Sequence, residues 1–155
     1  MKKVLFALAW GTRSDDKAGT SNEAMAEVID KTQLEYSLIL AQIEICLAIK
    51  KTSQFIPIGE QHQYINTFDC MKMMLDKTKQ NFDLNETEIF VLCHQMHWLG
   101  CKRVLSKLGV KNAKRIDVRI PYDPESDHWY TRSFTSTVLG YFVRGFSYIL
   151  RKQVK

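Results

Sequence analysis

Short runs of consecutive apolar residues, separated by longer stretches with helical periodicity, constrain the fold of this chain more than any other feature. These runs occupy residues 3–9, 55–59, 88–92 and 115–120. A continuous apolar run of this length is typical of a strand buried on both faces, as in a parallel sheet. Pro57 in the second run predicts a strand at the edge of the sheet or near a strand end, because proline cannot donate a ladder hydrogen bond.

The intervening stretches predict helices over residues 21–51, 66–81, 95–108 and 131–152. Asn66 or Thr67 is suited to cap the second helix, and Gly109 to end the third. The last helix is predicted to be a docking helix, with one apolar stripe formed by Phe134, Val138, Phe142, Phe146 and Ile149.

Strands that alternate with helices predict a mainly parallel sheet with helices on both faces. The length of 155 residues and the 45% of hydrophobic residues suit a single core. We therefore expect one α/β domain over residues 1–155, with a three-layer, Rossmann-like fold and a sheet of four to five strands.

The N-terminus and the cysteines bear on the cellular compartment. Lys2 and Lys3 followed by an apolar run resemble a signal peptide, but the run is short and no small-residue cleavage site follows, so a first core strand is favoured. No apolar run approaches the roughly 20 residues of a membrane span. The four cysteines lack the spacing of a disulfide scaffold, which predicts buried thiols and a cytoplasmic protein.

Positive charge is concentrated toward the C-terminus. Residues 101–155 contain 12 Lys and Arg against 4 Asp and Glu, within a chain of net charge +5. Such a segment could face phosphates, nucleic acid or anionic lipid, although charges this interspersed also suit a solvated helical surface.

Three polar segments, residues 11–21, 59–67 and 93–97, follow three of the predicted strands. Right-handed crossovers bring the ends of parallel strands to one edge of the sheet, where ligands bind. In the first segment, Gly11, Thr12, Arg13 and Ser14 suit an anion, because backbone amides, hydroxyls and a guanidinium bind phosphate or carboxylate. An ordinary polar loop is the alternative.

In the second segment, Glu60 lies near His62 and could act as a general acid or base. Asn66 and Thr67 are candidates for ligand contact as well as for helix capping.

The third segment, Cys93-His94-Gln95-Met96-His97, allows several interpretations. Cys93 at a helix start could be an activated nucleophile, or Cys93, His97 and Cys101 could bind a metal from one helix face. The favoured functional interpretation is that His94 or His97 hydrogen-bonds a ligand while the cysteines are buried, and no metal is expected. A purely structural histidine remains the alternative.

An apolar strand followed by Cys93-His94-Gln95-Met96-His97 and a helix resembles the signature of the bacterial SanA/ElyC/YdcF family. Glu60 followed by Asn66-Thr67-Phe68-Asp69 is similar to that family's acidic residue and Asn-Thr pair. The first strand with Gly11 and the closing helix from Leu139 are also similar. Gly100 stands where the family has an arginine, and the segment between the first two strands does not align cleanly.

The resemblance implies a Rossmann-like domain connected with cell-envelope metabolism, with S-adenosylmethionine as a possible cofactor. It also implies a site formed by Gly11, Glu60, Asn66, Thr67 and His97, in which His97 and Glu60 are the catalytic candidates. Whether the protein is an enzyme is left open.

Two functional hypotheses follow. The first is a small-molecule-binding or enzymatic domain that holds a nucleotide-like or phosphorylated ligand at the C-terminal edge of the sheet. The alternative is a non-catalytic interaction domain that binds nucleic acid or an anionic surface through residues 101–155. A minimal chelatase-like domain, suggested by Trp10-Gly11-Thr12-Arg13, ranks last.

Overall fold

The computed structural model describes residues 1–32, 35–50, 55–61, 63 and 65–153, with side chains up to residue 143. All five strands are parallel and form one sheet in the order β3-β2-β1-β4-β5. The strands are β1 (Lys2–Ala7), β2 (Leu38–Gln42), β3 (Phe55–Ile58), β4 (Thr87–Leu92) and β5 (Lys114–Arg115). The helices are α1 (Thr20–Lys31), α2 (Ile43–Cys46), α3 (Thr67–Asn81), α4 (Trp98–Lys107) and α5 (Phe134–Gln153), with short 3-10 turns η1 (Leu84–Glu86) and η2 (Trp129–Thr131).

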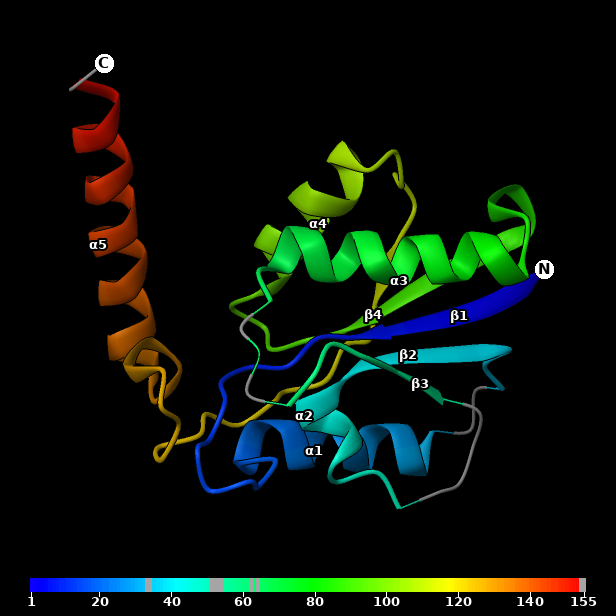
Figure 1. Cartoon of the computed structure of the whole chain (residues 1–155), viewed down its shortest axis with the longest axis horizontal. Helices are drawn as coiled ribbons and strands as arrows, with labels where there is room; N and C mark the ends of the chain where they lie inside the picture. Colours follow the sequence, from blue (N-terminus) through cyan, green and yellow to red (C-terminus); the bar gives the residue numbers. More distant parts are fainter. Residues whose placement is uncertain (33–34, 51–54, 62, 64, 154–155) are drawn as a thin grey trace.

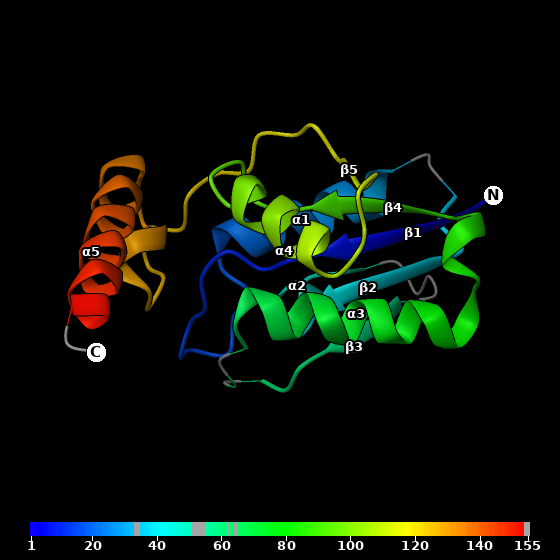
Figure 2. The same ribbon diagram turned by 90° about the horizontal axis from the view of Figure 1, so that it is seen from above.

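Helices cover both faces of the sheet, so the three-layer α/β prediction is confirmed. Helices α3 and α4 lie on one face and α1 and α2 on the other (Figures 1 and 2). Successive residues of β1 point to opposite faces: Val4 and Phe6 pack in the core beneath α3 and α4, whereas Leu5 and Ala7 pack in the core against α1. The central strands are therefore apolar at successive positions over Val4–Ala7 and Ile89–Leu92, as expected of a parallel sheet.

The predicted helix over residues 21–51 is wrong, because this stretch contains α1, β2 and α2. Strand β2 carries the run Leu38-Ile39-Leu40-Ala41, whose residues are at most 7% exposed between β1 and β3. Apolar residues on either side extended the pattern at helical spacing, and periodicity alone does not distinguish a short buried strand from a buried helix. Leu34 lies outside the described residues.

The other elements follow the sequence with smaller differences. Strand β3 is an edge strand, as Pro57 predicted, and Asn66 caps α3 by accepting a hydrogen bond from Asp69 N at 3.0 Å. Gly109, with φ +87°, ends α4 in the left-handed conformation. The strand predicted over residues 115–120 is wrong in extent. The chain leaves the sheet once Ile116 N has bonded Val91 O, and a tight turn follows in which Val118 N bonds Ile116 O.

Helix α5 stands away from the sheet and its covering helices and contacts η2 instead (Figure 1). Gly140 allows this contact, because a side chain there would meet Tyr130 Cβ at 2.7 Å. Phe134 and Phe142 of the predicted apolar stripe are 60% and 66% exposed, so the stripe does not pack on the sheet over the part of α5 whose side chains are described. Within the described range, no helix is long and apolar enough to cross a membrane.

Candidate functional site

A cavity of 330 Å³ lies at the C-terminal edge of the sheet. Its walls come from the segment after β1, from the end of β2 and from α2, from the segment between β3 and α3, and from the start of α3. Helix α4, η2 and α5 complete them. Its polar lining residues include Gln42, Glu44, Gln63, Thr67 and His97, and its aromatic ones are Trp10, His128, Tyr130 and Tyr141. The strand order changes direction between β1 and β4, and ligands of open α/β sheets bind at such a point.

Asn22, in the first turn of α1, fixes the segment after β1 that lines this cavity. Its side chain is 1% exposed, accepts a hydrogen bond from Trp10 N at 3.0 Å and donates to Gly11 O at 3.1 Å and Ala18 O at 2.8 Å. Gln42, at the end of β2, accepts a hydrogen bond from Ala9 N at 2.8 Å. Two side-chain amides thus replace the sheet hydrogen bonds that the backbone loses as it leaves β1.

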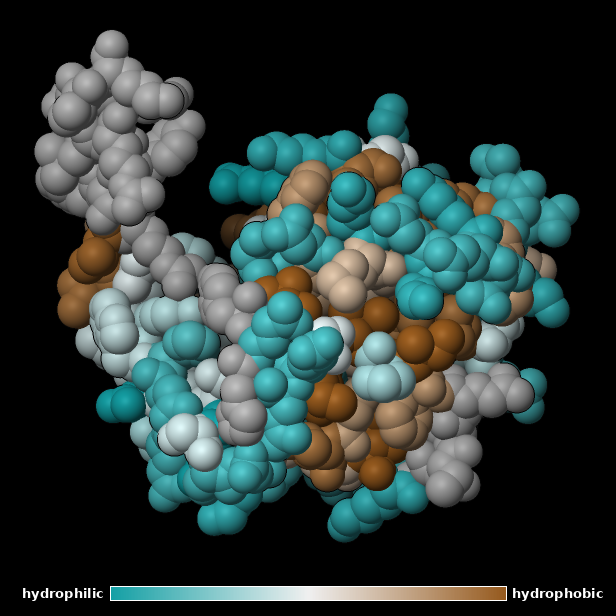
Figure 3. All heavy atoms as spheres, viewed as in Figure 1, coloured by the Kyte–Doolittle hydropathy of each residue, from teal (hydrophilic) through white to brown (hydrophobic). Residues whose placement is uncertain are grey.

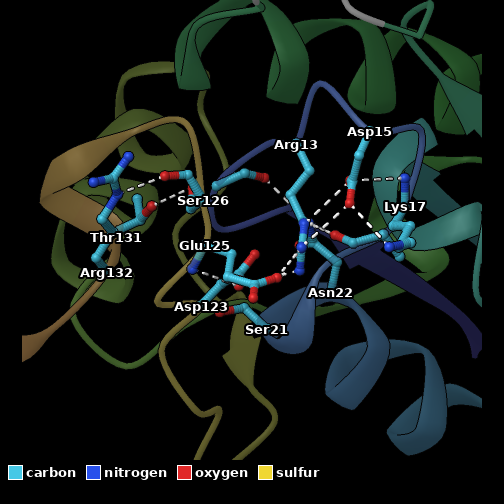
Figure 4. A network of polar contacts seen from close by, with 12 residues as sticks. Arg13, Asp15, Lys17, Ser21, Asn22, Asp123, Glu125, Ser126, Thr131 and Arg132 are labelled. Atoms are coloured by element: carbon cyan, nitrogen blue, oxygen red, sulfur yellow. Dashed lines mark hydrogen bonds and ion pairs between the residues drawn. The ribbon is translucent and has the colours of Figure 1, made fainter.

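Gly11, in the segment after β1, lies close to residues 121–133. Its φ is +90°, and a Cβ atom there would clash with Ser126 Oγ and lie 2.9 Å from Thr131 Oγ1. The carbonyl of Thr12 accepts hydrogen bonds from Asp127 N at 2.9 Å and Ser126 Oγ at 3.3 Å. Gly11 is therefore required for backbone geometry and packing. Ser126 in turn accepts hydrogen bonds from Thr131 Oγ1 at 2.8 Å and from Arg132 Nε at 2.7 Å, which tie η2 to this polar network (Figure 4).

Arg13 belongs to the same network and does not line the cavity. Its guanidinium forms ion pairs with Asp15 at 3.2 Å, with Asp123 at 3.7 Å and with Glu125, and its side chain is only 13% exposed (Figure 4). Asp123 is nearly buried, so Arg13 compensates a carboxylate that would otherwise be costly to desolvate. The predicted role of Arg13 as an anion ligand stays a prediction, and in this structure its donors face carboxylates.

His97 and Thr67 meet in the wall of the cavity, as the sequence predicted for two residues of one site. Thr67 Oγ1 lies 3.0 Å from His97 Nε2, and the tautomer of His97 decides which atom donates. His97 immediately precedes α4, and the hydroxyl of Tyr141 on α5 donates to the carbonyl of Met96 at 2.7 Å. A half-buried histidine with a hydroxyl partner can bind a ligand or transfer a proton.

His94 is a core residue behind the cavity wall. It is fully buried, stacks on Trp10 with ring centroids 4.6 Å apart, and contacts the ring of Tyr122 at 4.5 Å. Burial, together with the charges of His97 and Arg115, lowers the pKa of His94 to about 4. His94 is therefore neutral at pH 7, and its placement matches the structural alternative rather than direct ligand contact.

Cys93 and Cys101 are 0% exposed and belong to the core cluster under α3 and α4. The pKa of Cys101 is raised by its hydrogen bond with Cys93 and by burial, and burial together with the charge of Glu44 raises the pKa of Cys70 to about 12. All four cysteines are free thiols. Cys93 does not line the cavity, and a fully buried thiol is inaccessible to substrate.

Glu60 and Asn66, the remaining predicted site residues, lie outside the cavity lining. Glu60 is exposed in a turn, and neither it nor the capping Asn66 lines the cavity. His62 lies outside the described residues. Among the residues that the structure describes, no three His, Cys, Asp or Glu side chains are grouped to hold a metal ion.

Sequence reasoning missed Asn22, Gln42 and Glu44. Gln42 and Glu44 could have been found as the polar end of β2 if that strand had been recognised. The rule that ligand residues follow parallel strands had already located residues 11–21 and 93–97. Tyr130 and Tyr141 reach the cavity through the placement of η2 and α5, for which the sequence carries no local signal.

The fold and the cavity define a Rossmann-like α/β domain with a small-molecule-sized site at the C-terminal edge of a parallel sheet. No family model matches the chain, and searches of curated proteins and of solved structures found no significant match.

Proposed function

We propose that this protein binds a small, nucleotide-like molecule in the cavity at the C-terminal edge of its sheet. The observation that supports the proposal is the lining itself, which combines hydrogen-bonding side chains from the ends of four strands with aromatic rings from η2 and α5. A cavity of 330 Å³ is at the small end of the range for ligand sites, where a few polar groups set orientation among apolar walls.

The resemblance to the SanA/ElyC/YdcF family supports the same site from the sequence. Of the residues carried over by that resemblance, Gly11, Thr67 and His97 line the cavity. His97 is accordingly the candidate for proton transfer if the bound molecule reacts, with Thr67 orienting its ring. We propose a role in cell-envelope metabolism on the same basis, with S-adenosylmethionine among the first ligands to test.

A thermal-shift screen against nucleosides, nucleotides, S-adenosylmethionine and sugar phosphates tests the proposal. A ligand at 100 times its dissociation constant should add about 2.7 kcal/mol of stability. Gly100→Phe should abolish the shift, because position 100 lines the cavity and a Cβ there meets only His97 Cδ2, at 3.9 Å. Leu99→Phe, at the neighbouring and 68% exposed position of α4, is the control and should keep the shift. A flat screen with every compound would refute the proposal.

A second candidate function rests on the outer face of α5. Phe134, Leu139, Phe142 and Val143 are each at least 50% exposed, and a small hydrophobic patch is visible at the left edge of Figure 3, next to the grey part of this helix. The sequence continues the helical spacing with Phe146, Ile149 and Leu150, and residues 134–155 contain four Arg and Lys and no Asp or Glu. An apolar face combined with only positive charge favours an anionic lipid surface. A second copy of the helix would bring like charges together.

Co-sedimentation with phosphatidylglycerol vesicles tests this candidate. The protein should sediment with these vesicles and less with phosphatidylcholine vesicles, and Phe142→Glu should release it. Phe68→Glu, at a 42% exposed position of α3, is the control and should not. Equal binding of the native protein and of the Phe142→Glu variant to the vesicles would contradict the lipid assignment. Oligonucleotide binding that is the same in these two proteins would also contradict it.

A further inference from the structure

The cavity has an uneven charge distribution that bears on which ligands it accepts. Among the described residues that line it, Glu44 is the one carboxylate, and no lysine or arginine is present. The other polar groups are amides, hydroxyls and the two imidazoles of His97 and His128. A ligand group that carries a negative charge would therefore meet a carboxylate and no permanent cation from these residues.

Glu44 is built into the site rather than placed on its rim. It lies in the short helix α2, which starts directly after β2, and it is only 9% exposed. In a poorly solvated position, a carboxylate interacts with a nearby charge much more strongly than it would in bulk water. Burial is the main cause of the raised pKa of Cys46, and the charge of Glu44 is the second cause. The electric field of Glu44 therefore acts inside the protein.

Two cations near the sheet edge, Arg13 and Lys17, are already matched by carboxylates. Arg13 pairs with Asp15, Asp123 and Glu125, and Lys17 pairs with Asp15 at 3.2 Å. Arg13 is held by this network outside the cavity wall, at only 13% exposure. A phosphate in the cavity could recruit Arg13 only by breaking its ion pairs, and buried Asp123 would then lose its partner.

From this arrangement we infer that the cavity accepts a nucleoside, or a nucleoside derivative that carries a positive charge, and rejects the phosphorylated form. Glu44 accepts hydrogen bonds from ligand hydroxyl groups or pairs with a ligand cation, and it repels phosphate. The inference rests on the proposed function and narrows its ligand class from nucleotide-like to unphosphorylated.

Calorimetric titration with three matched compounds, adenosine, 5′-amino-5′-deoxyadenosine and adenosine 5′-monophosphate, tests the inference. The same series is made with another base if the thermal-shift screen favours one. The native protein should bind the monophosphate at least 30-fold more weakly than the nucleoside, and the amino derivative at least as tightly as the nucleoside. A monophosphate that binds as tightly as the nucleoside would overturn the inference while leaving the proposed function intact.

Variants assign the selectivity to Glu44. Glu44→Gln should reduce the 30-fold ratio to less than 5-fold, whereas Glu86→Gln, at an exposed position of η1 outside the cavity, should leave it unchanged. An unchanged ratio in a folded Glu44→Gln protein would refute the role of Glu44. The comparison of the three compounds on native protein stands even if that variant does not fold. Failure of every nucleoside and nucleotide to bind would refute the proposed function, and this inference with it.

Discussion

Asn22→Ala should destabilise the protein by about 3 kcal/mol, although Asn22 does not line the cavity. The side chain makes three hydrogen bonds to the backbone of one loop, at 3.0, 3.1 and 2.8 Å, from a position that is 1% exposed. Each buried partner that loses its hydrogen bond costs about 1 kcal/mol or more. Three such losses are a large part of the roughly 5–15 kcal/mol by which a domain is stable.

Urea unfolding at 25 °C measures this effect through a shift of the midpoint at constant slope. Asn81→Ala is the matched control, because the exposed Asn81 makes one hydrogen bond, to Lys77 O at 2.8 Å, and its loss should change stability by less than about 0.5 kcal/mol. A loss below about 1 kcal/mol for Asn22→Ala would refute the reasoning that this residue holds the segment after β1. The variant should also weaken ligand binding, since Trp10, Gly11 and Thr12 line the cavity.

Gly11→Ala should cost about 2–3 kcal/mol of folding stability, against about 1 kcal/mol for Gly109→Ala. Both glycines have φ near +90°, but of the two only Gly11 has atoms within 4 Å of an added Cβ, among them Ser126 Oγ. Urea unfolding of the two variants measures the difference, and equal losses of stability would contradict the prediction. The contribution of His94 to folding stability should be fully present above pH 6.5 and should fall by up to about 3 kcal/mol as the pH drops toward 4. The reason is that the unfolded chain binds a proton that folded His94, with its pKa lowered to about 4, does not bind. A pH series on the native protein and on His94→Phe measures this contribution, and an equal dependence of stability on pH in both would contradict the prediction. Thiol titration should show that the buried thiols of Cys70, Cys93 and Cys101 react slowly in the folded protein and rapidly in urea. A native Cys93 that reacts rapidly would support the nucleophile hypothesis instead.

The parts of the fold that the sequence predicted are those in which local signals agree with tertiary position. Strands β1 and β4 are apolar at successive positions, and Asn66 caps α3 in the way that its residue type favours. The sequence did not predict strand β2, because Leu38–Ala41 is followed by Ile43 and Ile45, whose spacing extends a helical pattern. That single error also hid Glu44, the residue on which the ligand class depends.

The parts of the site that could not be predicted depend on contacts between distant segments. Gly11 is predicted to be a ligand residue from its place after β1. Its neighbours Ser126 and Thr131, however, lie more than 100 positions further along the chain. Nothing near Arg13 in the sequence shows that Asp123 and Glu125 pair with it. The location of the site at the strand ends was predictable from topology, whereas the partners of its side chains follow from how residues 121–141 pack.

A crystal structure of the protein with the compound that gives the largest thermal shift tests the central claim most directly. The compound should lie in the cavity between the strand ends and α5, within hydrogen-bonding distance of Glu44 and His97. A compound bound elsewhere, with this cavity empty or closed, would contradict it.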